Sequence, residues 1–351
     1  MWIDLVHSFP QALDLLALTT CIGTLACRLW IIPCAPKESR VMHTLLSSLW
    51  RLLFACLAIL SLTSVIGLIQ RTAEMTGRPY SEVFPMLGVV LMNSHYGHTW
   101  FIRVLAVVML WGGWLLGRQK PKSRSISLLM LIGAIVVALM RSAAGHGADA
   151  GDLSLPELMD WFHLLAASLW SGSMVAFTAV IFPTWFRHGE QRIQLIAGMA
   201  RKFSSLAGIA LAAVLLTGFY NFWIEVRTFS ALWTTSYGHI LSFKFLLVLA
   251  LVFLGASNRF ISVPLLNSLA GYSPAGLGWS KWFTLRYLSR LRGSMDEHGI
   301  VRHFARKVMA EVVIMTGVLI CAALLIHETP ARHQVRTGQV NHQLHLEHGS
   351  N

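Results

Sequence analysis

The sequence predicts an all-α protein, a polytopic membrane helix bundle with eight transmembrane helices. The chain is 55% hydrophobic and only 13% charged, a composition typical of proteins that cross a membrane several times. Its apolar residues gather in runs long enough to span a bilayer, which takes about 20 residues per helix. Because backbone groups in lipid must be hydrogen-bonded internally, these runs are expected to form packed helices.

Eight apolar runs follow one another along the chain. Their approximate bounds are 12–33, 45–69, 100–117, 126–142, 161–183, 207–224, 240–256 and 308–326. The loops after the first, third, fifth and seventh runs are rich in Lys and Arg, which predicts that they face the cytoplasm. Both termini are then periplasmic. Since no basic segment precedes the first run, it is expected to be a span and not a cleaved signal peptide.

The net charge of +12 follows this alternation of loops. It therefore indicates a membrane protein surrounded by lipid, with no nucleic-acid partner. The five cysteines all fall in or beside the predicted spans, so no disulfide framework is expected.

An internal repeat is visible in the sequence. Tyr96-Gly97-His98 precedes the third run and Arg103 follows, whereas Tyr237-Gly238-His239 precedes the seventh run and Lys244 follows at the same spacing. The segment 14–23 also aligns with 163–172, so that Asp14 corresponds to His163. The runs are therefore predicted to form two four-helix repeats of one orientation.

Three regions are predicted from this repeat. Residues 1–143 form the first four-helix repeat, and residues 144–330 form the second, with a long cytoplasmic loop at 257–306. The loop is expected to lie on the inner leaflet as an amphipathic segment, with a small soluble subdomain as the alternative. The tail 331–351 is His-rich, of a weakly metal-binding type or simply a disordered polar end.

His163 is the ionisable side chain within the fifth run, and Met174 follows on the same helical face. An ionisable group at this depth usually faces the bundle interior or an aqueous path. Imidazole and thioether together suit copper better than magnesium or calcium. The alternative is a core histidine bonded to a neighbouring loop, with Met174 as packing.

Most histidines fall on the predicted outer side, which widens the set of candidate ligands. The candidate metal ligands are His163, His98, His239, His146, Met174, Cys21 and His327. Two further ionisable residues, Glu311 and Asp14, are possible relay groups. The alternative for Glu311 is an ion pair with Arg306 or Lys307 at the inner membrane surface.

Several motifs together resemble a known family. They are Gly145-His146-Gly147-Ala148, the segment from His163 to Gly172, Leu216-Thr217-Gly218, the segment from Leu232 to Lys244, Asn258-Arg259 with Pro264, and Glu311 with Thr329-Pro330. Their order is similar to that of the copper resistance protein D (CopD) family of bacterial inner-membrane proteins. Asp14 departs from the family, in which a histidine is common at this place.

The resemblance implies eight spans, copper movement across the inner membrane and a periplasmic CopC-type copper-binding partner. The predicted function is therefore copper transport, with copper taken from the periplasm by outer histidines and passed along Met174 and Cys21. No nucleotide-binding motif is present, and no enzymatic activity is expected. The alternatives are a copper-delivery or assembly factor for a membrane copper enzyme, and a membrane b-type cytochrome with axial histidines.

Overall fold

The computed structural model describes residues 2–32, 40–145, 151–188, 193–226, 231–272 and 297–327. Every regular element in this part of the chain is helical. Eight helical segments in it are long and apolar enough to cross a membrane. The all-α fold class and the eight spans are thereby confirmed. His146 and the tail 331–351 lie outside the described residues, as does the side chain of His327.

The first half of the bundle consists of four long helices and a short outer segment. The long helices are α1 (Trp2–Ala26, continued by η1, Cys27–Ile31), α2 (Arg40–Thr76), α4 (His95–Gln119) and α5 (Arg124–Ala143). Between α2 and α4 lie η2 (Tyr80–Glu82), η3 (Phe84–Met86) and α3 (Leu87–Asn93).

The second half also contains four long helical segments. They are α6 (Leu155–Ala176) with η5 (Phe177–Ile181) and α7 (Phe182–His188), then α8 (Ile193–Val226), then α10 (Ser236–Ser257) with η6 (Asn258–Ser262) and α11 (Val263–Leu269), and finally α13 (Glu297–His327). A single turn, α9 (Ala231–Thr234), precedes α10. The two-repeat relation and the division at residue 143 remain predictions.

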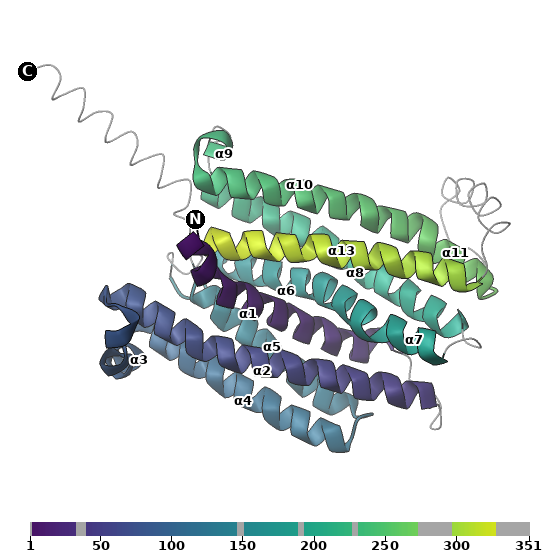
Figure 1. Cartoon of the computed structure of the whole chain (residues 1–351), viewed down its shortest axis with the longest axis horizontal. Helices are drawn as coiled ribbons and strands as arrows, with labels where there is room; N and C mark the ends of the chain where they lie inside the picture. Colours follow the sequence, from purple (N-terminus) through teal and green to yellow (C-terminus); the bar gives the residue numbers. More distant parts are fainter. Residues whose placement is uncertain are drawn as a thin grey trace, which may run out of the picture.

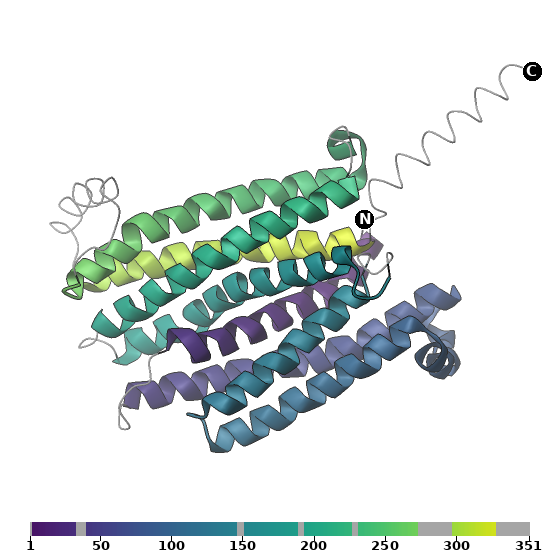
Figure 2. The same ribbon diagram turned by 180° about the vertical axis from the view of Figure 1, so that it is seen from behind.

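The first helices of the two halves form the centre of the bundle. Figure 1 shows α1 and α6 side by side, with α2, α4 and α5 on one side and α8, α10 and α13 on the other, and Figure 2 shows the same order from behind. In its most apolar stretch, the α1 span is 83% buried, whereas the α10 span is 11% buried. The outer helices therefore present apolar side chains to lipid, which is as apolar as they are.

Two glycines let α1 and α6 approach closely. A Cβ atom added at Gly23 would overlap the backbone of Gly172, and one added at Gly172 would overlap the backbone of Thr19. Gly23 and Gly172 are also the matching ends of the two aligned segments 14–23 and 163–172. Small residues at such crossings are typical of helix contacts in membranes.

Three spans contain a π-helical turn, and each turn ends two residues before a proline. The turns η1, η5 and η6 are followed by Pro33, Pro183 and Pro264. Proline has no N–H and its ring collides with the carbonyl four residues earlier. At η5 and η6 the π turn accommodates this collision and the chain continues as α7 and α11, whereas η1 ends at the extended residue Ile32.

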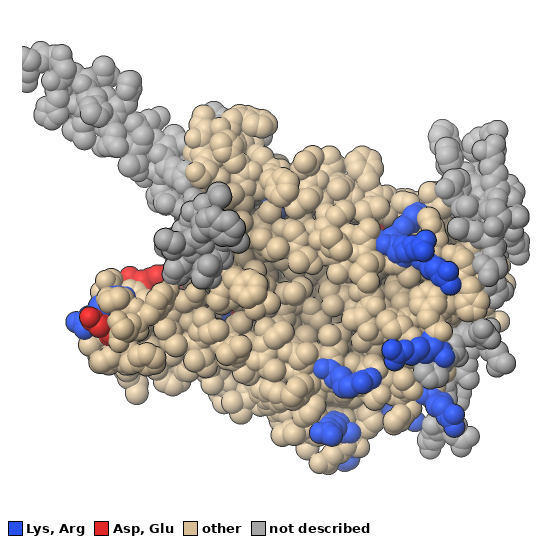
Figure 3. Space-filling model, in the orientation of Figure 1, with Lys and Arg blue, Asp and Glu red and all other residues tan. Residues whose placement is uncertain are grey.

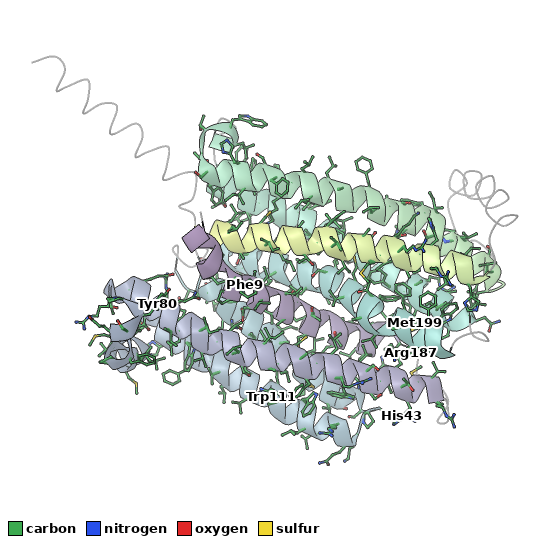
Figure 4. All side chains as sticks on the ribbon, in the orientation of Figure 1. Phe9, His43, Tyr80, Trp111, Arg187 and Met199 are labelled. Atoms are coloured by element: carbon green, nitrogen blue, oxygen red, sulfur yellow. The ribbon has the colours of Figure 1, made fainter. Side chains whose placement is uncertain are left out.

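The two ends of the bundle differ in charge. Figure 3 shows most Lys and Arg side chains at the end opposite the N-terminus. Figure 4 labels His43 and Arg187 at this basic end and Tyr80 at the other. Both η6 with α11 and the start of α13 run to the basic end as helix, so residues 258–269 and 297–306 do not form the loop predicted at 257–306. The predicted loop was therefore too long at both ends, because the helices continue past their apolar stretches, and its residues 273–296 lie outside the described residues.

Candidate metal site

His163 lies on α6, on the side that packs against α8. The imidazole extends from α6 toward α8, and its Nδ1 atom lies 3.0 Å from the hydroxyl oxygen of Thr217. Gly218 leaves the ring room, since a Cβ atom there would lie 3.1 Å from Cε1. The start of α6 is held in place by Ser142 of α5, whose hydroxyl bonds the carbonyl oxygen of Glu157 and the carboxylate of Asp160.

The hydrogen bonds of Thr217 define the tautomer of His163. The Thr217 hydroxyl donates to the carbonyl oxygen of Ala213 at 2.6 Å. Because a hydroxyl has one proton, a Thr217 hydroxyl that donates to Ala213 can only accept from Nδ1–H, and the carbonyl oxygen of Val214 is a second acceptor close to the ring. The Nε2 atom of His163 then carries a lone pair. Metal-binding histidines usually have this arrangement, in which one ring nitrogen donates a hydrogen bond and the other binds the metal.

Charged and thiol groups surround this imidazole. Lys244 of α10 lies within electrostatic range of His163, Asp160 and Cys321. Cys321 of α13 is 5% exposed. We call His163, Thr217, Lys244 and Cys321 the His163 cluster. Imidazole nitrogen and thiol sulfur are both ligands that copper accepts, and Asp160 compensates the charge of Lys244.

Met174 lies deeper on α6 and is fully buried. It belongs to an apolar cluster with Phe177 and Cys27, whereas Cys21 belongs to a separate cluster in the first half. Cys27 is hydrogen-bonded to Ser173, the neighbour of Met174 in sequence. The thiol in the same cluster as Met174 is therefore Cys27, while Cys21 is close to Cys56 of α2. The order His163, Met174, Cys21 expected from the sequence is not a chain of neighbours.

Asp14, a possible relay, lies at the centre of an ion-pair network. Its carboxylate receives hydrogen bonds from Thr63 of α2 at 2.6 Å, from Arg103 of α4 and from Arg141 of α5 at 2.6 Å. We call these four residues the Asp14 cluster. It joins all four long helices of the first half. Arg103 thus points into the bundle and does not extend to the outer headgroups.

The remaining histidine candidates do not join His163. His98 and His239 are exposed near the starts of α4 and α10, which lie on opposite sides of the bundle (Figures 1 and 2). The Nε2 atom of His239 bonds the carbonyl oxygen of Trp233 at 2.8 Å, so this ring faces α9. Within the described ranges, no group of three or more His, Cys, Asp and Glu side chains forms a metal site.

Glu311 is buried in α13 and is 3% exposed. Its carboxylate accepts a hydrogen bond from the amide of Asn258 in η6 at 2.9 Å. Lys307 donates instead to the hydroxyls of Ser257 and Ser262, at 2.8 and 3.5 Å. The described part of the chain contains no ion pair from Glu311 to Arg306 or Lys307, so the interfacial pair considered from the sequence was wrong.

Sequence reasoning missed two members of the His163 cluster. Thr217 and Cys321 are single residues in apolar helices. Both are far from His163 in sequence, so the sequence alone does not show that they belong to the same cluster. The signal for Thr217 was present, since it stands in the motif Leu216-Thr217-Gly218.

Known families match both halves of the chain. Residues 3–155 match the family described as copper resistance protein D-like, N-terminal domain. Residues 197–325 match the family described as copper resistance protein D. No solved structure matches the chain.

Individual relatives are distant in sequence. The chain is 25% identical over 213 residues to a protein of Bacillus subtilis (strain 168) named copper transport protein CutJ, a match covering 59% of this chain and 38% of that protein. It is 26% identical over 207 residues to copper resistance protein D of Pseudomonas syringae pv. tomato, covering 58% of this chain and 66% of that protein. The inner membrane protein YebZ of Escherichia coli (strain K12) is 26% identical over 211 residues, with 59% and 69% covered.

Proposed function

Because the chain belongs to the copper resistance protein D family, whose members have a copper-related membrane function, we propose that it transports copper across the bacterial inner membrane. The eight apolar spans and the inner-membrane relative support a multi-pass protein of that membrane. Copper is taken from the periplasm and moves inward in this proposal, and the protein acts as a transporter and not as an enzyme.

The observation that carries the proposal is the free Nε2 atom of His163. Thr217 holds Nδ1 and thereby directs the lone pair of Nε2 away from α8. Cys321 lies in the same cluster through its interaction with Lys244. An imidazole nitrogen and a sulfur atom fit copper, while the oxygen-poor surroundings do not fit magnesium or calcium. Copper is the substrate here and binds transiently.

A deeper station follows on the same helix. Met174 is 11 residues after His163, which places it about 16 Å further along α6 at 1.5 Å per residue. One copper ion cannot touch both side chains, so they act in succession. Cys27 shares the apolar cluster of Met174 and replaces Cys21 as the next sulfur ligand in our proposal. The passage from imidazole to thioether and thiol suits increasingly soft coordination of copper.

The basic end of the bundle faces the cytoplasm in this proposal. Lys and Arg concentrate at that end, and both the N-terminus and the end of α13 lie at the other (Figures 1 and 3). The excess of basic residues on the cytoplasmic side supports this orientation. The exposed His98 and His239 then face the periplasm, where a CopC-type copper-binding protein is the proposed partner.

Copper binding and uptake test the proposal with one pair of variants. His163→Ala should abolish most copper uptake into sealed vesicles and reduce the copper content of the purified protein, while the fold is kept because Ala is tolerated in a helix. His98→Ala is the matched control, since it removes an exposed histidine from the opposite side of the bundle. Its copper content and uptake should stay close to those of the unaltered protein.

Two results would contradict the proposal. If folded His163→Ala binds and transports copper normally, His163 is a structural residue. If the unaltered protein binds copper through His163 but does not move it across the vesicle membrane, the protein is a delivery or assembly factor and not a transporter. A visible spectrum with haem bands would instead identify a cytochrome.

A further inference from the structure

A second polar site lies in the apolar interior of the second half, toward the basic end. It consists of Glu311 in α13 and Asn258 in η6, which are 3% and 6% exposed. The Asn258 amide nitrogen donates to the Glu311 carboxylate at 2.9 Å. The Asn258 Oδ1 atom is buried and has no hydrogen-bond partner among the described residues. We call these two residues the Glu311 site.

The charge of Glu311 is poorly compensated. Helices α1, α6, α10 and α11 and the turns η5 and η6 pack against α13, and within their described parts none places a basic group on Glu311. Arg259 of η6 faces α8, where it donates to the carbonyl oxygen of Ser204. Lys307 of α13 is the cation within electrostatic range, but its ammonium group bonds two serine hydroxyls. A buried carboxylate without an ion pair tends to take up a proton.

We propose that Glu311 and Asn258 form a proton-binding site whose loading is exchanged for copper. In this step a proton adds to the carboxylate of Glu311 and gives a neutral carboxylic acid, which later releases the same proton. Asn258 suits both forms. Its NH₂ group donates to the carboxylate, and after rotation of the amide its Oδ1 atom accepts the hydrogen of the acid.

The backbone at this site supports the assignment. Asn258 is the first residue of the π turn η6, which is itself imposed by Pro264. Single π turns within α-helices are frequent at functional sites. The turn directs Asn258 toward α13 while Arg259, the next residue, reaches α8. In a regular α-helix, the side chains of neighbouring residues such as Asn258 and Arg259 point about 100° apart. A π turn changes this angle locally.

The link to copper rests on the proposed transport function. Inward movement of one Cu(I) ion with outward movement of one proton leaves the charge across the membrane unchanged. A buried acid on the inner part of the path can supply that proton. Glu311 lies near the middle of α13, ten residues or about 15 Å before Cys321 at 1.5 Å per residue, so protonation and copper binding occur at separate positions.

The first test measures protonation without copper. Infrared difference spectra of the purified protein between high and low pH should show the carbonyl stretch of a buried carboxylic acid, and Glu311→Gln should remove it. Glu74→Gln is the control, because Glu74 is exposed and paired with Arg71, and it should leave the band unchanged. Asn258→Leu removes the donor to the carboxylate, so the band should appear at higher pH. A Glu311→Gln spectrum that keeps the band overturns the proton site.

The second test measures coupling in sealed vesicles that contain a pH-sensitive dye. Copper uptake by the unaltered protein should change the internal pH, whereas Glu311→Gln should bind copper normally but lose this change. If Glu311→Gln transports copper with the same pH change, the coupling is disproved while copper transport stands. If the unaltered protein transports no copper, the transport function and the coupling fail together, and the infrared result alone decides whether the proton site exists.

Discussion

The two halves of the bundle each place an ionisable residue at a matching position in the aligned segments, Asp14 buried and His163 half-buried, but they surround it with different groups. Asp14 and His163 each lie nine residues before the glycines that join α1 and α6. Each meets a threonine hydroxyl of the next long helix, Thr63 or Thr217. The frameworks therefore agree down to individual side chains, in support of the predicted repeat.

The difference lies in the groups that surround these residues. In the Asp14 cluster, two guanidinium groups and a hydroxyl occupy the carboxylate oxygens. A metal ion there would have to displace a bound cation. In the His163 cluster, a single ammonium group lies within electrostatic range of the imidazole and of a thiol, and the Nδ1 atom of the imidazole contacts the Thr217 hydroxyl. Under the proposed function, one half would use the position for stability and the other for binding.

Asp14→Asn should have the largest effect on stability. The change keeps the size of the side chain but leaves Arg103 and Arg141 in the bundle without their counter-charge. Breaking a buried ion pair on one side costs about 3–5 kcal/mol, and unfolding in detergent would measure the loss. Asp152→Asn, which alters an exposed pair with His95, should cost less than about 1 kcal/mol. Equal stability of the two variants would show that the Asp14 cluster is not structural.

The contact between the halves can be tested at the central glycines. Gly23→Ala should destabilise the protein by about 1–3 kcal/mol or more, because the added methyl group meets the backbone of Gly172. Gly112→Ala is the control in α4, where nothing lies within 4 Å of the new Cβ atom, and it should stabilise the helix by up to about 1 kcal/mol. Unfolding of both variants in detergent measures the difference. A neutral Gly23→Ala would mean that the halves are not held at this crossing.

The sequence predicted the fold class and the number of spans because both follow from local composition and from lipid. It also predicted His163 as the central candidate and the correspondence of Asp14 with His163. It did not predict that Asp14 is neutralised by Arg103 and Arg141, since those residues are far from Asp14 in sequence. Side-chain pairing across helices depends on helix rotation, which hydrophobic runs do not determine.

The same reason explains the errors in the candidate site. His98 and His239 occupy matching places in the predicted repeats, but a repeat of parallel orientation puts matching residues on opposite sides of its axis. Because the sequences around His98 and His239 are similar, one shared site was expected. In the structure the two histidines are exposed and far apart. Cys21 was expected to follow Met174 on the copper path, whereas Cys27 shares the apolar cluster of Met174 and Cys21 belongs to the other cluster.

A matched pair of threonine variants would sharpen the comparison of the halves. Thr217→Val removes the acceptor that orients His163, so copper affinity should fall about 10–100-fold, as for other partners of metal-binding histidines. Thr63→Val removes one hydrogen bond to Asp14 and should cost about 1 kcal/mol of stability with unchanged copper affinity. Copper titration and unfolding of both variants would decide. Equal copper affinity of the two variants would remove the functional distinction between the halves.

The smallest stability effect is expected at Met174. Met174→Leu keeps the volume of the side chain within the apolar cluster, so its cost should stay below about 1.5 kcal/mol. Copper binding at His163 should be unchanged, because the two residues are about 16 Å apart along α6. Uptake into vesicles should nevertheless slow, since the thioether is the proposed second station.

Met199→Leu is the matched control for this last change. Met199 belongs to the same buried cluster but lies on α8, and the same volume argument applies to it. If both variants transport copper at the unaltered rate, Met174 only fills space and copper leaves the His163 cluster by another route. If both slow transport equally, the effect comes from packing of the cluster. Slower transport by Met174→Leu alone would assign the sulfur of Met174 to the path, and would extend the functional asymmetry of the halves from the outer cluster to the middle of the membrane.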